Sequence, residues 1–401
     1  MSTTEERRAM ADGGEEVVPA GFNKDALKKI AEEEIKKMEK LQLIPYPYKP
    51  PRYRYSKEKD TELTMADKEK MNQEKVDFEA YRRDVESWCR ASFERRTTLS
   101  SVYFAHYTPR QIPFSIVTTE ATLQIFSFKI VSCEFSWPLY VYGVVAVRDH
   151  VDNHRNILFE RSRRSAQLVT RDDPSLGLSG PSRAISAVDP VKIEVELKLK
   201  GRTESRDITL VKQRGHYSCS YIGFHTIDFS NCLCKAELSL EQLGSSVQAT
   251  FLSVCVVAGG PCTFKYGGRV YCSSLAHEVM ITNSQGNVKI VEPSSSQFVL
   301  IDSRDCADGK LPMDDTGLLD LARCVVSVPI DKWNDYSTQY EESLKVVIQA
   351  YSRSGVVAAQ AHVKLRPKLS NTTRVKCLLG YSKVEFIIAW SVMPKSEDYL
   401  I

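Results

Sequence analysis

The sequence lacks the features that direct a chain into or across a membrane. No apolar run approaches the roughly 18–20 residues that a membrane helix needs, and the richest stretch, Leu139–Val147, has only the length of a strand. The first twenty residues are acidic, with Glu5-Glu6 and Glu15-Glu16, and they lack the basic start and apolar core of a secretory signal. We therefore expect no membrane partner, and a cytoplasmic or nuclear location rather than secretion.

A strong net charge is also absent. The 54 Lys and Arg residues nearly balance the 51 Asp and Glu residues, which leaves +3 at pH 7. No field of the whole molecule would attract nucleic acid or anionic lipid. The charges are unevenly spread, however, because the first 100 residues hold 21 of each sign. The sequence therefore predicts a highly charged N-terminal region that is neutral overall.

Motifs of familiar catalytic and cofactor sites are missing as well. The sequence has no Gly-x-Ser-x-Gly elbow, no phosphate-binding loop and no dinucleotide fingerprint. Its eleven cysteines lack the paired spacing of structural zinc sites. In a reducing compartment we expect them to be free thiols, many of them small core residues. We expect no cofactor, and no sequence motif argues for an enzyme.

The N-terminal part reads as a tail followed by helices. Residues 1–21 predict a disordered acidic tail, and residues 22–98 predict a charged helical region. Apolar residues at helical spacing indicate helices over Lys24–Leu41 and from Thr64 to about Phe93. Four prolines make the intervening segment 44–57 extended.

Segment 44–57 is the strongest local binding candidate. Its interleaved aromatic and cationic side chains suit stacking on unpaired bases together with contacts to phosphates. Its prolines equally suit a groove on a partner protein, and a plain linker whose tyrosines pack on the rest of the chain is the third interpretation. The candidate residues are Tyr46, Tyr48, Lys49, Arg52, Tyr53, Arg54, Tyr55 and Lys57.

From about residue 99 the pattern changes to short strands. Val191–Leu199 alternates strictly between branched and charged residues, and Leu123–Val131 alternates nearly as well. Trp137–Val147 is apolar throughout, as expected for a strand buried on both faces. Further strands are predicted at Ala236–Leu240, Val247–Val257, Val270–Cys272, His277–Thr282, Phe298–Asp302, Val325–Pro329, Leu344–Tyr351, Val356–Leu365 and Val384–Trp390.

These strands predict a mainly β fold class. Because turn residues separate them and no long helical pattern intervenes, we expect an antiparallel β-sandwich over residues 99–395. It forms either one domain or two packed half-domains that meet near residues 215–235. Residues 396–401 complete the chain as a tail.

Four aspartates form a weak candidate for a calcium site. Ca²⁺ prefers six to eight oxygen ligands, and aspartates in loops at one end of a sandwich supply them. The candidates are Asp149, Asp152, Asp172 and Asp173. Arg148, Arg155 and Arg161 offer an alternative, because they can neutralise the same carboxylates.

Several motifs resemble one family of plant proteins. They include Phe104-Ala-His-Tyr-Thr-Pro-Arg110, Trp137-Pro-Leu-Tyr-Val-Tyr-Gly143, Gly180-Pro-Ser-Arg183 and Val384-Glu-Phe-Ile-Ile-Ala-Trp-Ser391. Residues 100–392 resemble a family expanded in grasses and known only as domain of unknown function 6598. The resemblance implies a stress or defence setting, because relatives in cereals sometimes carry this domain beside a ribosome-inactivating rRNA N-glycosidase. It implies no catalytic residues.

Three functions remain open at this stage. The favoured one is a non-enzymatic binding module that contacts a protein partner. The second is an enzyme or accessory domain that acts on ribosomal RNA. Glu79-Ala-Tyr-Arg82 superficially matches a four-residue core of the glycosidases, but so short a match is weak and an ordinary surface pair is the preferred explanation. The third is binding of RNA or ribosomes through residues 46–57.

Overall fold

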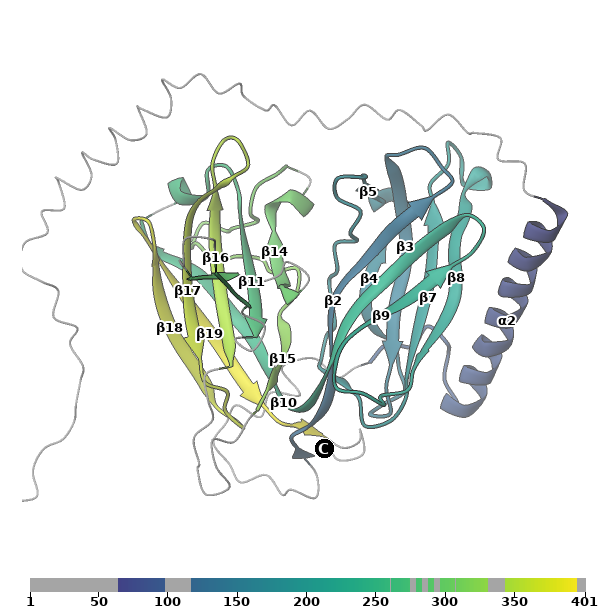
Figure 1. Ribbon diagram of the computed structural model, residues 1–401, viewed down its shortest axis with the longest axis horizontal. Coiled ribbons are helices and arrows are strands. Elements are labelled where there is room, and N and C mark those ends of the chain that lie inside the picture. The colour runs from purple at the N-terminus through teal and green to yellow at the C-terminus, as the bar shows by residue number, and fades with distance from the viewer. Residues whose placement is uncertain are drawn as a thin grey trace, which may run out of the picture. The chain divides into compact units, whose positions relative to one another are not determined.

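The computed structural model describes residues 64–97, 117–259, 261–274, 279–282, 288–291, 296–306, 308–330 and 343–394 (Figure 1). The predicted helix at Lys24–Leu41, the segment 44–57 with its eight binding candidates, and the two tails lie outside these residues.

Three antiparallel sheets make up most of the described chain. The first contains β3 (Leu139–Arg148), β4 (Asn156–Arg161), β5 (Gln167–Val169), β7 (Val191–Leu199) and β8 (Ile208–Tyr217). The second contains β2 (Glu120–Cys133), β6 (Ile185–Ser186), β9 (Gly223–Ser230), β10 (Cys234–Ala258), β15 (Val325–Pro329), β18 (Thr372–Leu379) and β19 (Ser382–Ser391). The third contains β11 (Gly268–Ser274), β14 (Phe298–Asp302), β16 (Leu344–Tyr351) and β17 (Val357–Leu365).

Smaller elements complete the described fold. Two short antiparallel pairs join β1 (Val117–Thr118) to β20 (Met393–Pro394) and β12 (Val279–Thr282) to β13 (Val288–Val291). Single 3₁₀ turns are η1 (Arg163–Ser165), η2 (Glu204–Arg206), η3 (Pro261–Phe264) and η6 (Ser303–Asp305). The described residues are therefore mainly β and antiparallel, which confirms the predicted fold class.

The 25-residue strand β10 joins two halves of the molecule (Figure 1). Its first part pairs with β2 and β9, and its second part, from Ser246 onward, pairs with β15 and β19. We call the half built on the first part lobe 1 and the half built on the second part lobe 2. The halves thus meet within β10, at a register shift between Leu243 and Ser246, and not at residues 215–235 as the sequence suggested.

Each lobe has its own hydrophobic core between two sheets. In lobe 1, buried residues of β2 and β10, such as Phe128 and Leu238, pack against those of β3 and β7, such as Val145 and Val195. Lobe 2 has the same plan, with Trp390 of β19 in the same buried cluster as residues of β11 and β16. Alternating apolar residues on facing strands therefore produce two two-layered units.

Helix α2 (Met65–Cys89) is the only α-helix among the described residues. It begins where the sequence predicts, because the side chain of Thr64 accepts a hydrogen bond from Asp67 N at 3.1 Å and the Asp67 carboxylate bonds back to Thr64 N. Phe78, Tyr81 and Val85 of its apolar face are buried against lobe 1 beside β8, whereas Trp88 of the same face is exposed. The helix ends at Cys89, four residues before the predicted Phe93, and Arg90 caps it in the left-handed conformation.

Candidate functional site

A cleft of about 670 Å³ lies between the two lobes. Its lobe 1 wall consists of the middle of β2, the end of β4 and the loop that follows β5. Its lobe 2 wall consists of β14, η6, Arg269 of β11 and the residues before β15. We call this site the interlobe cleft.

Charged side chains of both signs line the interlobe cleft. The cationic groups are Lys129, Arg161, Arg269, Arg304 and Arg323, and the carboxylates are those of Asp172, Asp173, Asp302, Asp305 and Asp320. Lys129 and Arg161, both on the lobe 1 wall, form no ion pair with any other described residue. The cleft therefore offers uncommitted charge to a ligand.

Asp302 organises the lobe 2 wall. One carboxylate oxygen accepts a hydrogen bond from the Tyr351 hydroxyl at 3.0 Å and lies 3.6 Å from Nε of Arg269. The other accepts from the backbone N–H of Arg304 at 3.0 Å. The guanidinium of Arg304 stacks over the Tyr351 ring and donates to the carbonyl of Gly355. These contacts fix the wall, so that its charges are positioned before any ligand arrives.

Asp305 titrates above the usual range of a carboxyl. Enclosure by the surrounding protein and, to a smaller extent, the charges of Asp302 and Asp173 raise its pKa to about 6, against the opposing effect of Arg269 and Arg161. The side chain still faces open cleft space, because its accessible surface is that of an exposed residue. Its Cβ and Cγ lie 3.9 Å from the place where a Cβ on Gly177 would stand. Asp305 therefore sits where the two walls approach each other.

Arg323 closes the inner end of the cleft. Its guanidinium donates to Gly180 O and Ile125 O, both at 2.7 Å, and stacks 3.6 Å from the centre of the Phe298 ring. Among the described residues no carboxylate pairs with it, and full burial lowers the pKa of Arg323 to about 9, which keeps it charged at neutral pH. Because Gly180 and Ile125 belong to lobe 1, this side chain cross-links the lobes.

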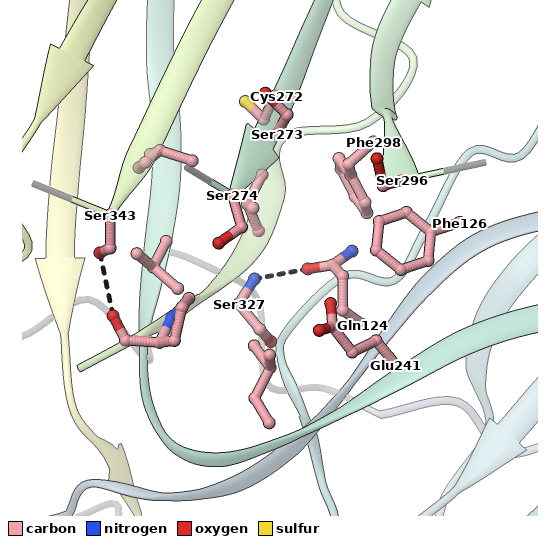
Figure 2. A pocket seen from close by; sticks show the side chains of 15 residues that line it. Gln124, Phe126, Glu241, Cys272, Ser273, Ser274, Ser296, Phe298, Ser327 and Ser343 are labelled. Atoms are coloured by element: carbon pink, nitrogen blue, oxygen red, sulfur yellow. Dashed lines mark hydrogen bonds between the residues drawn. The ribbon is translucent and has the colours of Figure 1, made fainter. Parts of the chain in front are cut away.

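A second pocket lies next to the interlobe cleft and is much smaller (Figure 2). Its space of about 20 Å³ matches a single water molecule. Gln124 accepts a hydrogen bond from Ser327 N at 2.8 Å, and Ser343 donates to Pro329 O at 3.0 Å (Figure 2). Ser273 Oγ is buried there and has no hydrogen-bond partner among the described residues. This pocket suits a bridging water and leaves the interlobe cleft as the site for a larger ligand.

The structure separates the four aspartates that the sequence offered as calcium ligands. Asp149 and Asp152 are buried around Arg183, whose guanidinium nitrogens lie 2.6 Å and 2.9 Å from their oxygens. Asp172 and Asp173 lie in the interlobe cleft instead. No group of three or more metal-ligating side chains occurs in the part of the chain that the structure describes. The neutralisation by arginine that the sequence suggested does occur, but through Arg183.

Glu79 and Arg82 of α2 take part in separate ion pairs. Nζ of Lys212 on β8 lies 2.6 Å from Glu79, whereas Arg82 binds Glu94 and stacks over the Phe93 ring. The two side chains thus hold the helix to lobe 1 and to the turn that follows it. This geometry matches the surface interpretation of the Glu-Ala-Tyr-Arg motif.

A buried ionic cluster beneath α2 was not foreseen from the sequence. Glu194 of β7 accepts from Arg155 Nε at 2.6 Å, pairs with Arg148, and accepts from the Tyr81 hydroxyl at 2.9 Å. Burial together with the nearby Glu194 raises the pKa of Tyr81 far above its usual value, so the phenol stays a donor. The alternation of β7 had placed Glu194 in solvent, but α2 covers that face.

Comparison with solved structures gives only remote matches. Human GIVD cytosolic phospholipase A2 has 7% identity and a TM-score of 0.20, over 70% of this chain and 33% of that one. The tandem C2 domains of Extended-Synaptotagmin 2 have 11% identity and a TM-score of 0.21, over 75% of this chain and all of that one. Such scores carry no inference about fold or function. The chain spans a third of the phospholipase.

Two further comparisons concern the sequence itself and its helices. No curated protein matches the chain. Among the described helices, none combines the length and the apolar character that crossing a bilayer requires. A family model does match residues 122–388, which is most of the β region. The chain therefore belongs to the family described as Domain of unknown function (DUF6598).

Proposed function

We propose that this protein is a non-enzymatic binding module and that the interlobe cleft holds a polar segment of a partner protein. The single observation that carries the proposal is a cleft of about 670 Å³ that is lined by charged side chains of both signs. Its volume falls within the roughly 300–1,000 Å³ typical of ligand sites. The plant stress or defence setting implied by the family resemblance is part of the proposal.

The charges on the two walls favour a ligand that itself carries both signs. Lys129 and Arg161 on the lobe 1 wall would meet a carboxylate, and Asp305 with Asp302 on the lobe 2 wall would meet a basic side chain. A segment of one charge sign would meet the groups of opposite sign and leave those of its own sign unpaired, which costs binding free energy. The proposed ligand is therefore an extended peptide with both acidic and basic residues.

Synthetic peptides of equal length test this proposal directly. We expect peptides that mix Lys and Glu to bind the full-length protein more tightly than all-acidic, all-basic or neutral peptides, as measured by fluorescence anisotropy. The double variant K129E/R161E should lose this binding at least tenfold. The matched control K198E/K364E reverses two exposed charges on strands outside the cleft and should keep it. Equal affinity of both double variants for the mixed peptide would refute the assignment.

A further inference from the structure

Two cysteines of lobe 1 face each other directly across a strand pair. Cys133 is the last residue of β2, Cys234 is the first residue of β10, and the two are register partners. The ten cysteines whose side chains the structure describes are all free thiols. Cys133 is half-buried and Cys234 is buried, so only the first is within reach of a solute.

The hydrogen-bond pattern shows which of the two kinds of antiparallel cross-strand pair Cys133 and Cys234 form. Glu134 N donates to Leu233 O at 3.0 Å, so the hydrogen-bonded position is the neighbouring pair Glu134 and Leu233. The N–H and C=O of Cys234 point the other way and bond to Asn231. Hydrogen-bonded and non-hydrogen-bonded pairs alternate along an antiparallel ladder, and Cα atoms approach to about 4.5 Å in the second kind, against about 5.5 Å in the first. Cys133 and Cys234 are therefore a non-hydrogen-bonded pair.

A disulfide fits between residues placed in this way. Its Cα atoms normally lie about 4.4–6.8 Å apart, and the spacing of a non-hydrogen-bonded pair falls within that range. The strands are already held in register on both sides, by Lys235 with Ser132 and by the contact of Glu134 with Leu233. Bond formation then requires rotation of two side chains and no separation of the strands.

The two thiols also differ in chemical character. A hydrogen bond from the Cys234 thiol lowers the pKa of Cys133, against the opposing effects of burial and of Glu134. The same hydrogen bond, together with burial, raises the pKa of Cys234. The thiolate is the form that attacks an oxidant, so Cys133 takes the role of the attacking sulfur and Cys234 that of the resolving one.

We propose that Cys133 and Cys234 are a redox site that forms a reversible disulfide on exposure to a hydroperoxide. The Cys133 thiolate attacks one oxygen of the peroxide, its O–O bond breaks, and Cys133 becomes a sulfenic acid while hydroxide leaves and is protonated to water. The Cys234 sulfur then attacks the Cys133 sulfur, the S–O bond breaks, and a second water leaves with the proton of Cys234. Two thiols and one hydrogen peroxide give one disulfide and two waters.

The position of this bond gives it a structural consequence. Cys133 and Cys234 lie at the two ends of the stretch from β3 to β9. This stretch includes the whole five-stranded sheet of lobe 1 and the loop with Asp172 and Asp173. The bond would close this stretch of chain into one covalent loop, which restricts the unfolded chain and stabilises the lobe. A thiol reductant would reverse this bond, because it lies at the end of a strand pair and one of its two residues, Cys133, is only half-buried.

Cys232 provides an internal rival for the resolving role. It lies two residues before Cys234 in the turn between β9 and β10, and it is half-buried. The ladder between β2 and β10 begins with the pair of Cys133 and Cys234, and Cys232 lies before it in a bend. The register therefore selects Cys234, which makes the identity of the partner a decisive result.

Peptide mapping of the oxidised full-length protein tests the proposal. After hydrogen peroxide and blocking of the remaining thiols, we expect nine of the eleven cysteines to be alkylated and one peptide to link Cys133 with Cys234. Dithiothreitol should restore both thiols. The variant C232S should form the same link, C133S and C234S should not, and C377S, which alters a half-buried cysteine of lobe 2, serves as the matched control.

Three outcomes would overturn the proposal. They are eleven alkylated cysteines after peroxide, a link from Cys133 to Cys232, and accumulation of sulfinic acid at Cys133 without any link. The wild-type map alone decides among them, so the test stands even if a serine variant fails to fold.

Discussion

Replacement of Glu194 by alanine would remove the shared acceptor of the buried ionic cluster beneath α2. The side chain of Glu194 is 1% exposed, as is that of Arg148, and the side chain of Arg155 is 6% exposed. Without Glu194, Arg155 would keep Glu196 at 2.7 Å. Arg148 would keep only main-chain acceptors, namely Asn153 O at 3.0 Å and Phe93 O.

The size of the expected loss of stability follows from the arginine charge that stays buried after the substitution. Removing one partner of a buried ion pair costs about 3–5 kcal/mol, because the other partner remains buried without compensation. Arg148 is in that position, and the Tyr81 hydroxyl also loses its acceptor. We therefore expect Glu194→Ala to lower the free energy of unfolding by about 3–5 kcal/mol.

Urea denaturation followed by circular dichroism measures this loss, and two variants calibrate it. Tyr81→Phe removes one hydrogen bond to a charged group and should cost about 1.5–3 kcal/mol. Glu196→Ala removes the 30% exposed partner of Arg155 and should cost no more than about 1 kcal/mol. Because Tyr81 belongs to α2, Glu194→Ala should also speed proteolysis within the helix. Equal losses for Glu194→Ala and Glu196→Ala would refute the reasoning.

Three further predictions concern the cleft and lobe 2. The pKa of Asp305 is raised to about 6 in the folded state, so this group favours folding at acidic pH, and that contribution is lost as pH rises through about 4 to 6. Asp305→Asn should therefore flatten the pH dependence of the free energy of unfolding in that window and increase stability at pH 7. Arg323→Met should lower stability by about 1–3 kcal/mol for each carbonyl left unbonded, those of Gly180 and Ile125, and should raise hydrogen exchange on both sides of the cleft. Trp390→Ala should cost about 3–5 kcal/mol in urea denaturation, because the fully buried ring fills the lobe 2 core.

Periodicity in the sequence predicted the strands that bury one complete face. β7 has the predicted bounds, Val191–Leu199, because its branched residues alternate without a break. β14, β15 and β16 also have their predicted bounds. The strands β8, β9 and β18 were missed, since half or more of their side chains meet solvent or α2 and the apolar alternation is interrupted. Local pattern thus located the strands whose apolar alternation is unbroken.

The continuity of β10 could not be predicted from pattern alone. The sequence indicated two strands, Ala236–Leu240 and Val247–Val257, which are one strand in the structure. The residues between them change partners, from β2 and β9 to β15 and β19, and Gly244 stands where a Cβ would come within 2.8 Å of Ile222. The polar and small residues at this crossing resemble a turn in sequence, because only the tertiary partners keep the backbone extended.

The cleft was the part least accessible to sequence reasoning. Its charged groups come from stretches as distant as Lys129, Asp173 and Arg323, and each looks like an ordinary surface residue in its own segment. Asp172 and Asp173 were singled out, but for calcium and in company with Asp149 and Asp152. The sequence around Arg323 did not indicate that this arginine is buried, because its hydrogen-bond acceptors are carbonyls of residues about 140 to 200 positions away.

The contacts between the lobes connect this cleft to the rest of the molecule. The walls belong to separate cores, and their connections include β10, the Arg323 cross-link at the inner end, the hydrogen bond from Ser327 N to Gln124 and the approach of Asp305 to Gly177. Arg323 holds the inner end by hydrogen bonds to main-chain atoms, which persist whatever the charge on nearby carboxylates. Asp305 and Asp173 repel each other across the cleft, and this repulsion weakens when either carboxyl is protonated or bound to a cation. A basic side chain between the walls would remove the same repulsion, so ligand binding and closer approach of the walls favour one another.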